Sequence, residues 1–209
     1  MASFTVRDPI QFSYQWANLD LLSNGRMLLA ACTGLVPAGG ASAREGAFWG
    51  MADRDRPARL EENIQICRRL WGGDNVTFSG KFTQFEDVTI EPKPVQQPCP
   101  IWIASNPDPS TARPAIVERN LRRAARLADG WMSTRRVPGV FAQNWNKLCE
   151  FLQDQGRDPE EFPNMVYHNI NINEDRQLAL DESRLYLEEY YGVVFPPPIV
   201  EGWTAAGTP

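Results

Sequence analysis

The sequence contains a single histidine, His168, and its four cysteines are scattered along the chain without a close pair. A histidine-based metal site therefore cannot form, and the cysteine spacing fits neither a zinc site nor a disulfide framework. This cysteine pattern is typical of reduced thiols in a cytoplasmic protein. The phosphate loop G-x-x-x-x-G-K-[ST], the dinucleotide fingerprint G-x-G-x-x-G and the nucleophile elbow G-x-S-x-G are also absent. Their absence argues against the commonest nucleotidase, Rossmann and serine hydrolase chemistries.

Long apolar runs and an excess of positive charge are lacking too. The longest purely apolar run, residues 27–32, has six residues, whereas a membrane span needs roughly 20. The start of the chain lacks the apolar segment of a secretory signal. A formal net charge of −5 gives no general attraction for nucleic acid or an anionic membrane. We therefore expect a cytoplasmic protein whose partners are small molecules.

The 209 residues, 43% hydrophobic and 22% charged, are typical of one globular domain over residues 1–209. Short apolar segments alternate with amphipathic ones, which predicts an α/β fold with parallel strands and right-handed crossovers. Strands are predicted at 26–33, 101–104, 131–132 and 164–173, and helices at about 9–22, 54–71, 114–128, 141–152 and 175–191. An excursion of short strands is predicted at 76–90. This alternation alone fits an open sheet or a barrel.

Three local expectations depend on residue pattern. The first helix is expected to present Ile10, Tyr14, Ala17 and Leu21 on one apolar stripe. Residues 35–50 form a long segment of small residues, which predicts a functional loop. In the strand at 164–173, polar and apolar side chains alternate, and its polar face, with Asn169, is a candidate for the interior of a barrel.

The stretch at 87–106 carries most of the functional argument. Its four prolines at 92, 94, 98 and 100 exclude helix interior and central strand. The apolar strand at 101–104 then stops abruptly at Ser105 and Asn106. Because ligands of α/β sheets bind beyond the carboxyl ends of the strands, this loop is the first candidate site.

Four stretches, at 19–34, 48–71, 76–105 and 122–131, together with the final Gly-Thr-Pro, resemble in order and spacing the luciferase-like monooxygenase family of flavin- and F420-dependent oxidoreductases. The resemblance implies a (β/α)8 barrel. Such a barrel has eight strands in about 250 residues, whereas this chain shows about four parallel β/α units. We therefore expect an internal piece of the barrel, without its N-terminal strands and its last β/α unit. Uncovered sheet edges would then favour homo-oligomers.

The resemblance also implies where a cofactor would lie. The loop at Ser105 and Asn106 matches the family's phosphate-holding loop, and Cys32 ends the strand that faces the flavin ring. Where the family has a basic residue, this sequence has Thr33. The residues implied to contact the cofactor are Cys32, Thr33, Gly34, Arg56, Ala104, Ser105, Asn106, Ser110 and Thr111, with no metal and no assigned catalytic residue.

Each assignment has a plainer alternative. Ser105 and Asn106 also suit an ordinary cap and turn, and Cys32 a small core position. Arg56 could be a solvated arginine near Glu61 or Glu62, and Arg44 with Glu45 a surface ion pair. The segment Asp129-Gly130-Trp131 is interpreted as structural, and the lone His168 as a satisfied group.

The resemblance implies a flavin-dependent oxidoreductase acting on a small organic substrate. With reduced FMN and O2, supplied by a flavin reductase, it would oxygenate; with coenzyme F420 it would transfer a hydride. We expect this chain alone to be inactive. Two alternatives are a non-catalytic luciferase-like flavin-binding or stabilising subunit and a carbohydrate-active barrel using carboxylates such as Glu45, Glu86 or Asp87.

Overall fold

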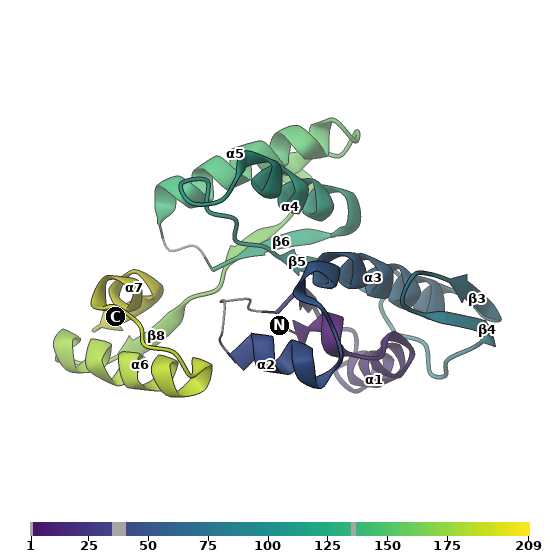
Figure 1. Cartoon of the computed structure of the whole chain (residues 1–209), viewed down its shortest axis with the longest axis horizontal. Coiled ribbons are helices and arrows are strands. Elements are labelled where there is room, and N and C mark those ends of the chain that lie inside the picture. The colour runs from purple at the N-terminus through teal and green to yellow at the C-terminus, as the bar shows by residue number, and fades with distance from the viewer. Residues whose placement is uncertain (1, 35–40, 135–136) are drawn as a thin grey trace.

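A five-stranded parallel sheet forms the centre of the computed structural model, which describes residues 2–34, 41–134 and 137–209 (Figure 1). Its strands are β1 (Ala2–Ser3), β2 (Leu29–Cys32), β5 (Ile101–Ala104), β6 (Gly130–Ser133) and β7 (Asn164–Val166). They lie side by side in the order in which they follow one another in the sequence, and every neighbouring pair is parallel. A sheet that never reverses its winding direction is the arrangement of a barrel wall, whereas a doubly wound sheet reverses it.

Helices cover one face of this sheet. They are α1 (Pro9–Leu22), α3 (Arg56–Gly72), α4 (Pro114–Leu127) and α5 (Pro138–Gln153). Helix α2 (Ala41–Phe48) lies between β2 and α3 in the sequence, and short 3-10 turns occur at Phe4–Val6, Asp53–Asp55 and Pro159–Glu161. Helix α1 packs on α3, α3 on α4 and α4 on α5. Strand residues such as Ile103 and Trp131 join the helices in the main core. The alternate residues Ala30, Trp102 and Met132 form a smaller cluster on the other face. The structure thus confirms a partial (β/α)8 barrel.

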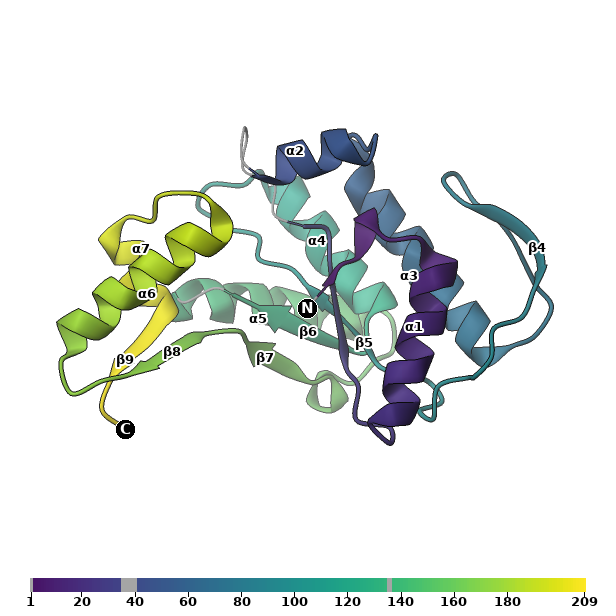
Figure 2. The same ribbon diagram turned by 90° about the horizontal axis from the view of Figure 1, so that it is seen from below.

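The C-terminal unit has a core of its own. Strands β8 (Asn169–Ile172) and β9 (Thr204–Gly207) pair in parallel, and α6 (Arg176–Tyr191) and α7 (Pro197–Trp203) connect them (Figure 2). Leu180, Leu187 and Val200 are buried within this unit. The sequence analysis predicted α6, but it missed α7 and β9.

The predicted strand at 164–173 is divided into β7 and β8, and Tyr167 and His168 lie between the two strands. The expectation for its polar face was wrong. Asn169 Nδ2 donates to the carbonyl of Trp203 at 3.1 Å, and Asn171 Nδ2 to that of Ala179 at 3.0 Å, so this face meets the helices. Because the Asn169 and Asn171 amides bond to the backbone of the helices, Ile170 and Ile172, which alternate with them, face away from the helices.

The predicted strand excursion is an antiparallel hairpin of β3 (Val76–Ser79) and β4 (Gln84–Val88). Glu62 of α3 is buried and accepts hydrogen bonds from the backbone N–H groups of Lys81 and Phe82 at 2.8 and 3.1 Å. A Cβ on Gly80 would lie 2.5 Å from the Glu62 carboxyl carbon. The carboxylate therefore fixes the turn of the hairpin and requires glycine at position 80.

Two local predictions were wrong. Helix α1 buries Phe12, Ser13, Ala17 and Asp20, whereas Tyr14 and Leu21 of the predicted stripe are each 49% exposed. Polar side chains occupy the inner face because they have buried partners: Ser13 Oγ donates to the Pro9 carbonyl at 2.7 Å. In the predicted loop at 35–50, residues 41–48 form helix α2 instead, and residues 35–40 lie outside the described residues.

Among the described helices, none combines the length and apolar character needed to cross a lipid bilayer. Within the same ranges, no group of three or more His, Cys, Asp or Glu side chains is placed to hold a metal ion.

Helix α6 supplies a test of local stability. Asp175 caps the helix, since its Oδ1 accepts from the N–H groups of Gln177 at 2.9 Å and Leu178 at 3.1 Å. The Asp175→Ala variant is expected to lose about 1 kcal/mol of unfolding free energy, measured by urea denaturation. Glu189→Ala, an exposed change on the same helix, is the control and should stay within about 0.5 kcal/mol of wild type. Equal losses in both variants would contradict the assignment of the cap.

Candidate functional site

The carboxyl ends of β2, β5 and β6 meet at one edge of the sheet. Ala31 of β2 pairs with Ile103 of β5, and Ala104 pairs with Met132 of β6. Since the strands are parallel, the segments 32–34 and 104–106 follow neighbouring strands at the same edge. We call these two segments the rim. The structure thus brings together the two parts of the chain that the sequence analysis singled out.

The loop after β5 is fixed by its neighbours. Trp131 Nε1 donates to the Ser105 carbonyl at 3.0 Å, and the Ser105 N–H donates to the Met132 carbonyl at 3.1 Å. The Asn106 side-chain oxygen accepts from the N–H of Thr134. Asn144 of α5, 1% exposed, donates to the Pro107 carbonyl at 2.8 Å. Backbone and side chains of this loop are therefore held in place by β6 and α5.

Ser110 and Thr111 are engaged in a turn before α4. The Asp108 carboxylate accepts from the Ser110 N–H at 2.9 Å and from its hydroxyl at 2.5 Å. The Thr111 N–H donates to the Asp108 backbone carbonyl at 3.1 Å. A carboxylate already occupies the Ser110 donors, so a phosphate would have to displace Asp108 to reach them.

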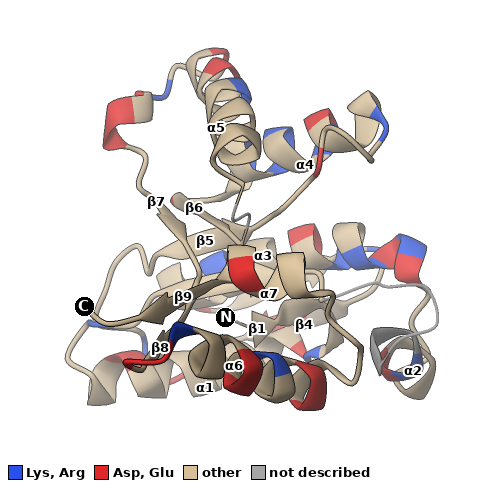
Figure 3. Cartoon of the chain, turned by 90° about the vertical axis from the view of Figure 1, so that its left-hand side faces the viewer, with Lys and Arg blue, Asp and Glu red and all other residues tan. Residues whose placement is uncertain are grey.

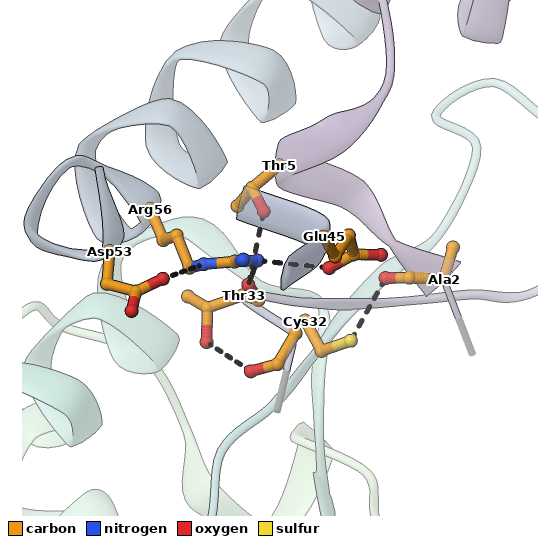
Figure 4. A network of polar contacts seen from close by, with 8 residues as sticks. Ala2, Thr5, Cys32, Thr33, Glu45, Asp53 and Arg56 are labelled. Atoms are coloured by element: carbon orange, nitrogen blue, oxygen red, sulfur yellow. Dashed lines mark hydrogen bonds and ion pairs between the residues drawn. The ribbon is translucent and has the colours of Figure 1, made fainter. Parts of the chain in front are cut away.

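Arg56 is the centre of a buried network at the end of β2 (Figure 4). The residue is 0% exposed. Its Nη1 donates to the Thr33 carbonyl at 3.1 Å and lies 3.3 Å from Glu45 Oε2, while Nε donates to Asp53 Oδ1 at 2.8 Å. Arg56 thus joins the end of β2 to α2 and to the turn before α3. It is not a solvated arginine near Glu61 or Glu62.

The positions of Glu45, Glu86 and Asp87 decide two further expectations from the sequence. Glu45 pairs with Arg56, which is a partly buried contact and not the surface pair with Arg44. Thr5 Oγ1 also donates to the Thr33 carbonyl, at 3.1 Å. Glu86 and Asp87 lie in β4 of the hairpin, so the three carboxylates considered for a carbohydrate-active site do not form one cluster.

Gly34 occupies a position that other residues would strain. Its φ is +86°, a left-handed conformation that favours glycine. A Cβ at this position would lie 2.8 Å from Arg56 Nη1 and 3.2 Å from Ser3 Oγ. The rim is therefore built with glycine where the guanidinium approaches the backbone.

Cys32 is partly buried, and its thiol donates to the Ala2 carbonyl at 3.1 Å. Burial raises the pKa of the Cys32 thiol above its ordinary value, although hydrogen bonds with the Gly34 backbone and the Ser3 side chain lower it in part. A thiol that stays protonated is a poor nucleophile. Cys32 is thus unsuited to thiolate chemistry.

Several residues of the site were missed by the sequence analysis. Asp108 stands two residues before Ser110, and an Asp-Pro-Ser sequence is a turn signal that could have shown the competing hydrogen bonds. Asp53 stands three residues before Arg56, a spacing that also favours a pair. Thr5 and Asn144 gave no local signal, because their partners Thr33 and Pro107 lie 28 and 37 residues away.

A parallel, singly wound α/β sheet with polar loops at its carboxyl rim defines a (β/α)8-type protein. The family model described as luciferase-like monooxygenase matches residues 2–202, and the chain belongs to this family. The resemblance found in the sequence is thereby confirmed.

Among curated relatives, an F420-dependent glucose-6-phosphate dehydrogenase of Amycolatopsis mediterranei is 34% identical over 183 residues, covering 86% of this chain and 50% of the relative. The oxygenase component of a flavin-dependent trigonelline monooxygenase from Acinetobacter baylyi is 30% identical over 188 residues, covering 90% of this chain and 49% of the relative. The chain thus spans about half the length of the curated relatives it matches.

Solved structures share the fold. Monooxygenase RslO1 from Streptomyces bottropensis superposes with a TM-score of 0.71 at 22% identity, over 95% of this chain and 56% of that protein. An F420-dependent secondary alcohol dehydrogenase in complex with an F420–acetone adduct also reaches 0.71, at 16% identity, over 100% of this chain and 64% of that protein. At these identities the likeness supports the fold alone.

Proposed function

We propose that this chain forms part of a flavin- or deazaflavin-dependent oxidoreductase that binds FMN or coenzyme F420 at the rim. The observation that carries the proposal is the juxtaposition of segments 32–34 and 104–106 at neighbouring strand ends. Support comes from the family membership and from relatives that are named as F420-dependent or flavin-dependent. The cofactor would supply oxygen activation in the first case and hydride transfer in the second.

The residues present fit a phosphorylated ring system. Ser105 and Asn106 offer polar groups within a half-buried loop beside the small residue Ala104, and Gly34 lets the Arg56 guanidinium approach the end of β2. In this proposal Ser105 and Asn106 bind the phosphate, and Cys32, Thr33 and Gly34 contact the ring. Arg56 acts as a positioning residue, since its guanidinium holds the Thr33 carbonyl, Glu45 and Asp53.

The partners follow from the cofactor. A small organic substrate would be oxygenated or oxidised, and an FMN-dependent reaction would need a flavin reductase to supply reduced cofactor. We further propose that the chain forms homo-oligomers. Ile170 and Ile172 of β8 are 73% and 68% exposed, which is unusual for apolar strand residues and is a liability in an isolated copy. We propose that turnover requires the further β/α units that complete a barrel.

Cofactor titration tests the rim. Oxidised FMN and F420 are titrated separately into the chain and followed by cofactor fluorescence. We expect one of them to bind, and Ser105→Ala to weaken its binding about fivefold to tenfold because a hydrogen bond to phosphate is lost. Thr77→Ala, a change of an exposed hydroxyl residue in the distant hairpin, is the control. Binding of neither cofactor, or equal affinities of the two variants, would count against the proposed site.

A further inference from the structure

A second polar hollow lies on the outer side of the helix layer. The groove between α3, α4 and the β3–β4 hairpin has a volume of about 570 Å³. A smaller hollow of about 340 Å³ adjoins it along α4, and the two share Glu61, Arg119 and Arg123. Figure 3 shows the Lys and Arg segments on α3 and α4. The groove is within the usual size range of small-molecule sites, roughly 300–1,000 Å³.

Both carboxylates of the groove are already engaged. Glu62 accepts from the backbone N–H groups of the hairpin turn. Glu61 accepts from Arg123 Nε at 2.8 Å and also pairs with Arg126. Burial raises the pKa of Glu61, but the guanidinium groups of Arg123 and Arg126 more than offset this and hold it below its ordinary value. The oxygens of both glutamates are therefore already hydrogen-bonded within the protein.

Three more guanidinium groups face the groove, from Arg54, Arg69 and Arg119. In the part of the chain that the structure describes, no ion pair involves any of them. Arg69 lies over the Phe78 ring, 5.2 Å from its centroid, which holds the side chain along the groove wall. The chain therefore gathers positive charge at one place although its formal net charge is −5.

Neutral donors and a rigid wall complete the lining. Gln65 and Ser79 border the groove and can donate hydrogen bonds. Arg123 is 6% exposed and is held by Glu61 and by Asn120 Oδ1 at 3.0 Å. Arg123 is thus a buried residue shared by the two hollows, whereas Arg119, which also lines both, is exposed. Planar guanidinium groups bind oxyanions in this way, by paired charge-assisted hydrogen bonds.

We propose that this groove binds a small polyvalent oxyanion, such as a phosphorylated metabolite or a polycarboxylate. Several guanidinium groups without acidic partners around one hollow favour two or more negative charges on the ligand. The negative charge of the whole chain argues against an extended polyanion such as nucleic acid. The proposal does not depend on the cofactor proposed for the rim, since no residue is shared between the two sites.

Anion titration tests this groove. Pyrophosphate and citrate are titrated into the protein by isothermal calorimetry at fixed ionic strength, with sodium chloride as the reference. We expect saturable binding of at least one of them, weakened at least tenfold by Arg119→Gln. Arg184→Gln, a change on α6 outside the groove, should leave the affinity unchanged. The preferred ligand, pyrophosphate or citrate, distinguishes a phosphate source from a polycarboxylate source.

Three results would overturn the proposal. One is that neither pyrophosphate nor citrate gives a heat of binding larger than that of the sodium chloride reference. Another is equal affinity of the Arg119→Gln and Arg184→Gln variants, both checked for native circular dichroism. The third is an anion affinity that falls in the Ser105→Ala variant as much as in Arg119→Gln, because this would place the anion at the rim. A failed cofactor titration, by contrast, leaves the anion result intact.

Discussion

Replacing Gly130 with alanine is expected to lower the free energy of unfolding by about 3 kcal/mol, the upper end of the cost of overpacking a core. A Cβ at this position would lie 2.4 Å from Cε2 and 2.6 Å from Nε1 of Trp102. The indole cannot move away easily, because it is 8% exposed and packs with Ala30 and Met132. Strands β5 and β6 must therefore separate or distort. Urea unfolding followed by circular dichroism measures the loss.

Gly139→Ala is the matched control for this substitution. Gly139 lies in the first turn of α5, and a Cβ there would have no neighbour within 4 Å. Alanine favours a helix over glycine by up to about 1 kcal/mol, so this variant should be neutral or slightly stabilised. A further variant, Gly130→Ala with Trp102→Leu, should recover part of the loss because the smaller side chain can yield. A mild effect of Gly130→Ala alone would contradict the packing of Trp102 over the strand.

The sequence predicted the wall of the barrel well because its signals are local. The strand at 101–104 has its predicted bounds, since prolines precede it and polar residues follow it. Helices α3, α4 and α5 begin at or near a proline, which marks the first turn of a helix. The parallel order follows from the alternation of strands and helices. The tail was less predictable: Pro196, Pro197 and Pro198 suggest an irregular segment, yet helix α7 begins at Pro197.

Orientation within the elements was predicted less well. Periodicity identified α1 as a helix but not its inner face, because Ser13 and Asp20 are buried through hydrogen bonds that apolar spacing does not reveal. Asp20, for example, accepts from the backbone N–H of Gln96 at 2.9 Å, a partner 76 residues away. Non-local pairs of this kind decide which side of an amphipathic segment faces the core.

For the candidate site, too, local features were predictable and non-local partners were not. Strand ends can be read from the sequence, and the rim segments at 32–34 and 104–106 do meet. The surroundings of Arg56 could not be read, because its partners Thr33 and Glu45 lie 23 and 11 residues away. A sequence pattern identifies a residue type that could bind a phosphate. Only the fold shows whether the hydrogen-bond donors of that residue already bind other groups of the protein.

Arg56→Met is expected to lower the free energy of unfolding by about 3 kcal/mol, because a buried charge pair loses one partner. The estimate is at the low end of that range since Glu45 and Asp53 keep 33% and 43% exposed side chains and can regain water. The loss of the hydrogen bond to the Thr33 carbonyl should also release the end of β2. The variant should therefore bind the rim cofactor more weakly as well, measured by the same fluorescence titration.

Two further variants separate positioning from direct contact. Arg56→Lys keeps the charge but cannot donate from Nε and Nη1 together, so an intermediate loss of stability is expected. Arg44→Met removes an exposed arginine from the neighbouring helix α2 and should leave stability within about 0.5 kcal/mol of wild type. If Arg56→Met lost cofactor affinity while keeping wild-type stability, the guanidinium would contact the cofactor itself. Parallel losses in both measurements support the buried network as the element that shapes the rim.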